Sequence, residues 1–413
     1  MKDPTKALGS LELHPRTKAA VLILVLALVC ALTLSREFYE QLAADIFFSL
    51  TLAGCTIIFF SVRPPGESLQ LICVTAALLS LQSFALKISF KFLPTLGLLG
   101  LGSLLLLIIR RIWSYGPGRQ LLQDSIVPPL LFIVLGYLGS GPLAITGRLH
   151  PKTLDLFLYS FDQSLGLQLS FLVGRVVLRS PVFTRIMLVM YYALPIAIML
   201  TYARLLIRDR RMAMAAFLAF LVAGPLGVVF YNLVPACGPA YLVGAKFPYE
   251  ALSTAQLRNM PLQAIVVEGV RNAFPSLHMG WALLAWWYSE RLSLAARMVI
   301  AIFLAGTALS TLGLGEHYFV DLVTAFPFAL MIQAACALNV SNFSARKLVP
   351  LVAGALLMLA WVVLLRFGLR IVQMSPVVPW MFVTFTITSS VLLQRRVRCA
   401  FPSLDQPLGA GIS

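Results

Sequence analysis

Residues 271–278 read RNAFPSLH and residues 315–321 read GEHYFVD, and between them the sequence predicts an apolar helix, a turn and a second apolar helix. The chain of 413 residues contains only four histidines, which are His14, His150, His278 and His317. Two of the four, His278 and His317, fall in this stretch, and each begins an apolar run. We therefore interpret the rest of the chain around this pair.

His317 and Asp321 are four residues apart at the head of an apolar run that continues to Phe326. On a helix this spacing puts both side chains on one face, with their Cβ atoms about 5–6 Å apart. Asp321 can then accept the Nδ1 proton of His317, which leaves Nε2 free to act as a nucleophile or a base. The pattern therefore predicts a reactive imidazole that a carboxylate orients.

His278 follows Pro275 and Ser276 at the start of another apolar helix, where unpaired backbone N–H groups and the positive end of the helix dipole attract an anion. Ser276 adds a hydroxyl donor and Arg271 adds a permanent cation. Two imidazoles with anion-binding groups between them suit phosphoryl transfer, in which one histidine attacks phosphorus and the other protonates the leaving oxygen. This chemistry requires neither a metal ion nor a cofactor.

These residues resemble the motifs of the type 2 phosphatidic acid phosphatase superfamily, which are a Ser-Gly-His motif and a later Ser-Arg-x5-His-x3-Asp motif. Ser276-Leu277-His278 and Ser310…His317…Asp321 have the same order and spacing, and the similarity covers residues 125–338. The Pro-Ser-Leu-His form, the His-Tyr-x-x-Asp form and the upstream sequence PACGPAY at residues 235–241 are most similar to the inositol phosphorylceramide synthase and sphingomyelin synthase branch, the inositolphosphotransferase-like members.

The resemblance implies that His317 is the nucleophile, Asp321 its orienting partner and His278 the general acid, and that Ser276 binds phosphate. It also implies a six-helix catalytic core.

Two positions depart from the family motifs: Leu277 replaces the central glycine, and Thr311 stands where the motif has its phosphate-binding arginine. The first motif of the superfamily, Lys-x6-Arg-Pro, does not occur in the chain. We therefore expect Arg271 or Lys246 to bind the phosphate instead. Both lie in a loop rich in proline, glycine and tyrosine, residues 235–273, which we expect to cover the site and to bind the lipid headgroup with Tyr241 among its contacts.

The composition predicts an integral, multi-pass membrane protein, because 60% of the residues are hydrophobic, 12% are charged and the mean hydropathy is +0.90. About 20 apolar residues are needed for each helical span, and about twelve runs reach or approach that length. They are residues 19–35, 43–62, 68–86, 92–109, 125–146, 182–206, 212–233, 275–290, 294–313, 317–338, 349–367 and 375–394. The fold class is therefore an all-α polytopic membrane protein.

The net charge of +16 does not indicate nucleic-acid binding, because the basic residues lie in short loops between the predicted spans. Their distribution follows the positive-inside rule best when both termini are cytoplasmic. His278 and His317 then lie at the extracytoplasmic ends of their helices, so the site would face the periplasm or a lumen.

Three regions follow from this pattern. Residues 1–112 form an N-terminal membrane region of four helices, residues 113–340 the catalytic core, and residues 341–413 two further spans with a basic C-terminal tail. Within the core, residues 151–181 mix apolar and charged side chains as amphipathic helices at a membrane surface do. These helices either guide a headgroup or support a lid, or they pack structurally on the outer face. Asp162 with Leu165-Gly166 resembles a feature of the same family branch. We assign structural roles to His14, His150 and Glu316.

The sequence thus predicts a lipid phosphotransferase that moves a phosphoryl or phospho-headgroup, for example of the phosphoinositol type, from a phospholipid donor to a lipid alcohol through a phosphohistidine. If water is the acceptor, the enzyme is a lipid phosphate or polyprenyl pyrophosphate phosphatase. A twelve-helix transporter is a third interpretation. Transporters place their binding groups near the bilayer midplane, whereas these candidates gather at one membrane face.

Overall fold

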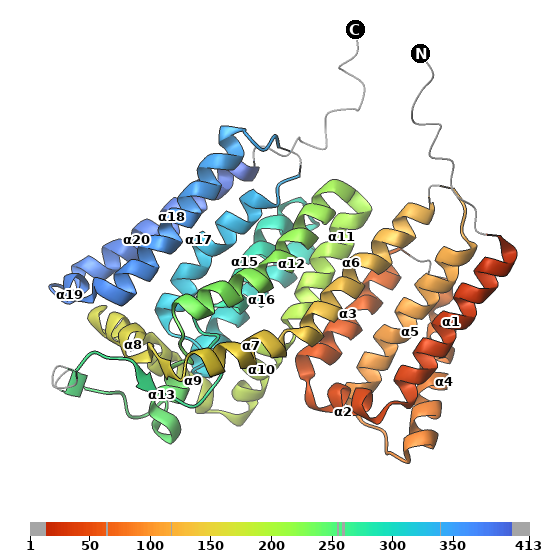
Figure 1. Ribbon diagram of the computed structural model, residues 1–413, viewed down its shortest axis with the longest axis horizontal. Helices are drawn as coiled ribbons and strands as arrows, with labels where there is room; N and C mark the ends of the chain where they lie inside the picture. Colours follow the sequence, from red (N-terminus) through yellow and green to blue (C-terminus); the bar gives the residue numbers. More distant parts are fainter. Residues whose placement is uncertain are drawn as a thin grey trace, which may run out of the picture. The chain divides into compact units, whose positions relative to one another are not determined.

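The computed structural model describes residues 14–62, 65–116, 118–253, 256–257, 261–338 and 340–398. The outer parts of the predicted end regions, residues 1–13 and 399–413, lie outside this description. The chain forms two compact units, Met1–Leu131 and Phe132–Ser413, coloured red to orange and orange to blue in Figure 1. The boundary falls inside α6 (Gly118–Leu138). The predicted division into three regions remains a prediction.

The all-α prediction is confirmed, and every predicted span coincides with helical structure. In the described part of the chain, eight helices are long and apolar enough to cross a membrane, or up to ten if each of two bent helix pairs is one span. The exact count of twelve remains a prediction, because α15 (Leu277–Tyr288) has 12 residues and α17 (Phe319–Ala335) has 17. Both are shorter than the roughly 20 residues of a full span.

Unit 1 is a helical bundle that carries none of the predicted site residues. Its helices are α1 (Pro15–Leu34), α2 (Arg36–Ala44), α3 (Ile46–Val62), η2 (Pro65–Glu67), α4 (Ser68–Leu86), α5 (Phe92–Trp113) and the first part of α6. Helices α3 and α5 pack together along their length. They approach so closely at Gly100 that a Cβ atom there would lie 1.9 Å from the carbonyl oxygen of Leu52.

Unit 2 contains the helices that position the site. They are α7 (Ser140–Leu149), α8 (Asp155–Ser164), α9 (Leu169–Leu178), α10 (Pro181–Tyr192), α11 (Leu194–Arg208), α12 (Arg210–Leu233), α13 (Pro239–Val243), η3 (Gly244–Lys246), α15, η4 (Ser289–Arg291), α16 (Leu294–Gly313), α17, α18 (Ala345–Phe367), α19 (Leu369–Val372) and α20 (Val377–Arg398). Helix α15 packs against α11, α12, α16 and α17, while α17 also packs against α18 and α20 (Figure 1).

Residues 151–181, predicted to form one or two amphipathic helices, contain α8 and α9, which lie with α13 at one end of this bundle (Figure 1). Helix α9 packs against α16, and α8 packs against α17. The sequence did not predict the two-stranded antiparallel sheet beside them, in which β1 (Lys152–Thr153) pairs with β2 (Ile265–Val266). Strands of two residues are too short to carry the alternating pattern that identifies a strand.

Candidate active site

His278 lies in the first turn of α15, and local sequence chemistry places it there. Ser276 is the N-cap, and its side-chain oxygen accepts the backbone N–H of Met279 at 3.3 Å, as serine commonly does at this position. The His278 ring stacks on Tyr191 of α10, with ring centroids 4.1 Å apart and planes inclined by 23°. The cap and the stacked ring together fix the position of the imidazole.

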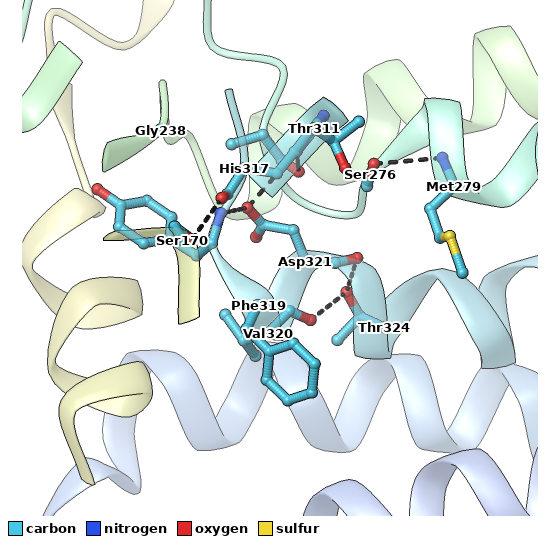
Figure 2. Close-up of polar contacts among 12 residues, drawn as sticks. Ser170, Gly238, Ser276, Met279, Thr311, His317, Phe319, Val320, Asp321 and Thr324 are labelled. Atoms are coloured by element: carbon cyan, nitrogen blue, oxygen red, sulfur yellow. Dashed lines mark hydrogen bonds and ion pairs between the residues drawn. The ribbon is translucent and has the colours of Figure 1, made fainter. Parts of the chain in front are cut away.

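His317 lies in the connection between α16 and α17, outside both helices. Its Nδ1 is 2.9 Å from the carbonyl oxygen of Ala273. A carbonyl oxygen can only accept, so this contact requires the proton on Nδ1 and leaves Nε2 with its lone pair. The Ser170 hydroxyl donates to the His317 carbonyl at 2.9 Å and holds the backbone of this residue (Figure 2). The site thus contains one buried neutral imidazole with a defined tautomer.

The predicted hydrogen bond between His317 and Asp321 is replaced by a longer contact. Asp321 Oδ2 lies 3.6 Å from Nδ1 (Figure 2), beyond normal hydrogen-bond distance. This oxygen instead accepts the backbone N–H of Tyr318 at 2.8 Å, because an acidic residue at the third position of a helix reaches back to cap its start. Ala273, not Asp321, therefore orients the ring. At 3.6 Å the Asp321 carboxylate still stabilises an imidazolium electrostatically.

The two imidazoles lie close together, with ring centroids 6.4 Å apart and planes inclined by 62°. A backbone hydrogen bond joins the start of α15 to the first turn of α17, since the N–H of Ser276 donates to the carbonyl oxygen of Asp321 at 3.1 Å. Figure 2 shows Ser276, His317 and Asp321 gathered at the start of α17. The structure therefore brings together four of the predicted site residues, namely Ser276, His278, His317 and Asp321.

Two buried carboxylates of α8 support this arrangement. Asp162 accepts the N–H groups of Phe319 at 2.7 Å and Val320 at 3.1 Å, and so caps α17. Asp155 accepts a hydrogen bond from the Tyr318 hydroxyl at 2.9 Å. Both side chains are fully buried, and burial raises the pKa of each above its ordinary value. The sequence indicated Asp162 only weakly and Asp155 not at all.

Arg271 lies in the loop before α15 and contacts backbone carbonyl groups. Its guanidinium donates to the carbonyl oxygens of His150 at 3.2 Å, Pro151 at 3.2 Å and Gly269, and the residue is buried. These contacts tie the loop after α7 to the loop before α15. These bonds give Arg271 a structural role between the two loops, and its binding of phosphate remains a prediction.

Lys246 and Tyr241 each contact an acidic side chain. Lys246 is largely exposed and forms an ion pair of 3.1 Å with Glu250. It lines an open pocket of about 550 Å³ with Arg175 and residues of the loop after α13. The Tyr241 hydroxyl donates to the Glu316 carboxylate, 3.3 Å from each oxygen. Tyr241 thus contacts Glu316, the residue that precedes His317. Glu316, for which we predicted a structural role, therefore lies beside a candidate site residue.

The described residues contain no group of three or more His, Cys, Asp or Glu side chains arranged to hold a metal ion. The polar groups at the site are two imidazoles, a serine hydroxyl and the N–H groups of the first turn of α15. The hydroxyl and the N–H groups suit contact with an oxyanion.

The search of curated proteins found no match, and the search of solved structures found none. A family model does match the region from α8 to α17, which is less than half of the chain. That region contains every residue predicted for the site. Residues 156–335 match the model of the PAP2 superfamily, and this match supports the superfamily that the two histidine motifs resemble.

Proposed function

We propose that this protein is a membrane lipid phosphotransferase, which moves a phosphoryl or phospho-headgroup from a phospholipid to a lipid alcohol through a phosphohistidine on His317. The observation that supports it most directly is the hydrogen bond from Nδ1 of His317 to the carbonyl oxygen of Ala273. It reserves the Nε2 lone pair for attack, as a nucleophilic imidazole requires. The match to the PAP2 superfamily supports the same class of chemistry.

In the first half of the reaction, Nε2 of His317 attacks phosphorus, and the bond from phosphorus to the leaving alcohol oxygen breaks. Protonated His278 donates its proton to that oxygen. The His317 ring becomes positively charged, and the Asp321 carboxylate 3.6 Å away stabilises this charge. One oxygen of that carboxylate, Oδ1, is buried without a hydrogen-bond donor among the described residues, and the imidazolium would supply the counter-charge that this buried carboxylate lacks.

In the second half, the hydroxyl of the lipid alcohol attacks phosphorus and gives its proton to His278. The bond from phosphorus to Nε2 breaks, and His317 returns to its neutral form with the proton on Nδ1. Ser276 and the N–H groups at the start of α15 would bind the phosphate oxygens in both halves. We place this site on the extracytoplasmic side, because the basic loops favour cytoplasmic termini.

The charges around the site favour a phosphodiester donor over a phosphate monoester. Arg271 donates to backbone carbonyls and Lys246 forms an ion pair with Glu250. Both predicted cations thus already have other partners, which leaves less positive charge to bind phosphate. A phosphodiester carries one negative charge, whereas a monoester carries up to two and needs more compensation. Phospholipids are diesters, and lipid phosphates that a phosphatase would hydrolyse are monoesters.

The test is turnover by the purified full-length protein in mixed phospholipid vesicles, with and without added ceramide or diacylglycerol. Mass spectrometry would measure any new phospholipid, free headgroup phosphate and inorganic phosphate. We expect new lipid that depends on the added alcohol and is absent in His317→Ala. Release to water alone would identify a phosphatase, and no product that depends on His317 would argue for the transporter.

The acid limb of the pH profile is expected to lie unusually low. Burial lowers the pKa of His317 from 6.5 to about 4, although the Glu316 carboxylate and the hydrogen bond to Ala273 oppose this shift. Because the neutral imidazole attacks, the loss of activity at acid pH occurs only as the pH falls through this lowered pKa. We therefore expect kcat/KM, which reports the free enzyme, not to decrease between about pH 7 and about pH 5.5.

Glu316→Gln is the matched variant for this profile. It removes the carboxylate that raises the pKa of His317, so the acid limb of its pH profile should move to still lower pH. An acid limb near pH 6.5, the ordinary value for histidine, would contradict a buried neutral nucleophile.

A further inference from the structure

A closed circuit of hydrogen bonds runs through His317, and most of its members lie far apart in the sequence. It begins at Asp155, the first residue of α8. Both oxygens of this carboxylate accept the backbone N–H of Cys237 at 3.1 Å, and Oδ1 also accepts the N–H of Gly238 at 2.9 Å. The Asp155 carboxylate therefore fixes the turn that precedes α13.

This turn, which Asp155 fixes, positions Ala273, whose carbonyl group orients His317. The backbone N–H of Ala273 donates to the carbonyl oxygen of Ala236 at 3.0 Å, one residue before Cys237. The carbonyl oxygen of Ala273 then accepts the Nδ1 proton of His317 at 2.9 Å. A displacement of the turn would thus move the acceptor on which the tautomer of His317 depends.

Tyr318 closes the circuit, because it follows His317 directly and its hydroxyl donates to Asp155 Oδ1 at 2.9 Å. We call the set Asp155, Ala236 to Gly238, Ala273, His317 and Tyr318 the Asp155 ring. The side chains of Asp155, His317 and Tyr318 are at most 2% exposed. Water therefore does not compete for these hydrogen bonds, and a buried polar group that loses its partner finds no other.

We propose that Asp155 and Tyr318 are positioning residues of the candidate site. Their hydrogen bonds hold the Ala273 carbonyl against Nδ1 of His317 and so keep Nε2 as the unprotonated nitrogen. The catalytic consequence rests on the proposed function, in which Nε2 attacks phosphorus. The existence of the Asp155 ring depends only on the observed hydrogen bonds and not on the proposed reaction.

The ring also assigns different tasks to the two carboxylates near His317. Asp321 is bound to the N–H of Tyr318 and lies 3.6 Å from Nδ1, which suits stabilisation of charge. Asp155 acts at a distance through the Tyr318 hydroxyl and the turn, which suits control of geometry. Loss of the Asp155 ring should therefore disturb the tautomer without removing the counter-charge.

The test is Tyr318→Phe in the full chain, because this substitution deletes one hydroxyl and keeps the aromatic side chain that fills the space. Its matched control is Tyr159→Phe. Tyr159 is also fully buried and on α8, and its hydroxyl donates to the carbonyl oxygen of Leu252 at 3.2 Å. Tyr159 contributes no hydrogen bond to the Asp155 ring, so the two variants lose a comparable bond in different places.

Two readouts separate positioning from stability. The first is the kinetics of transfer, where we expect Tyr318→Phe to lower kcat by about 10- to 100-fold, as loss of a supporting partner commonly does, with KM within about two-fold. The second is ¹⁵N NMR of histidine-labelled protein, with the His317 signal assigned by its loss in His317→Ala. We expect the wild type and Tyr159→Phe to hold the proton on Nδ1, and Tyr318→Phe to populate the other tautomer.

An unchanged tautomer in Tyr318→Phe would overturn the inference, and so would a loss of kcat no greater than in Tyr159→Phe. The NMR readout needs no substrate, so it tests the ring even if the proposed reaction is wrong. Conversely, transfer that depends on His317 but not on the Tyr318 hydroxyl would leave the proposed function intact and remove the positioning role.

Discussion

His317→Ala is expected to lower kcat/KM for lipid transfer by at least about 10³-fold, or about 4 kcal/mol of transition-state stabilisation. The variant has no nucleophile to form the bond to phosphorus, and the remaining donors can only bind substrate. The measurement is initial rate against donor concentration in vesicles of fixed composition. A parallel thermal unfolding curve should change little compared with the loss of rate.

The control for this prediction is His14→Ala, which removes an exposed histidine at the N-cap of α1 and should keep the wild-type rate. The intermediate gives a second measurement: wild type quenched during turnover of headgroup-labelled donor should retain label on the protein in an alkali-stable and acid-labile bond, and His317→Ala should retain none. More than about a tenth of the wild-type rate in His317→Ala would contradict nucleophilic catalysis by this residue.

The parts of the site that the sequence predicted correctly depend on local patterns. A serine before an apolar run marks the start of a helix, and this signal placed Ser276 and His278 at the start of α15 as observed. The apolar runs on either side of the turn placed His317 as the first residue of the last core helix, whereas the structure places it in the connection before that helix. The two histidines meet because α15, which carries His278, packs against both helices that flank His317.

The hydrogen-bond partner of His317 depends on a long-range contact and was not predictable in this way. Ala273 offers only a backbone carbonyl, and nothing in its residue type indicates that a histidine 44 positions away will donate to it. The role of Asp321 did have a local signal. An acidic residue three positions after a helix N-cap is typical of a capping residue. This interpretation of Asp321 competes with the one drawn from its four-residue spacing from His317.

The structural contacts of Arg271 were not predictable for a related reason. An arginine in a loop beside a presumed anion site suggests a phosphate ligand, but its five donors also suit carbonyl groups. The carbonyls it contacts belong to His150 and Pro151, about 120 positions earlier in the chain. The sequence cannot show that these two loops meet, because no periodic pattern links them.

His278→Ala is expected to show a loss that depends on the leaving group. For a phospholipid donor, whose alkoxide leaves poorly without a proton, kcat should fall by about 10²- to 10⁴-fold, the usual contribution of a general acid. For a short-chain donor with a nitrophenolate leaving group, which departs without a proton, the loss should be far smaller. His317→Ala should lose both activities alike, because the bond to the nucleophile forms in either case.

The comparison of rates with the two donors therefore separates proton donation by His278 from nucleophilic attack by His317. His150→Ala serves as a control, since that ring lies 3.2 Å from the Asn232 side chain and should leave both rates unchanged. Equal losses with both donors in His278→Ala would assign the residue to binding or structure rather than to proton donation. A selective loss would mean that the ring 6.4 Å from His317, held by the N-cap of Ser276 and the stack on Tyr191, is placed to protonate the leaving oxygen.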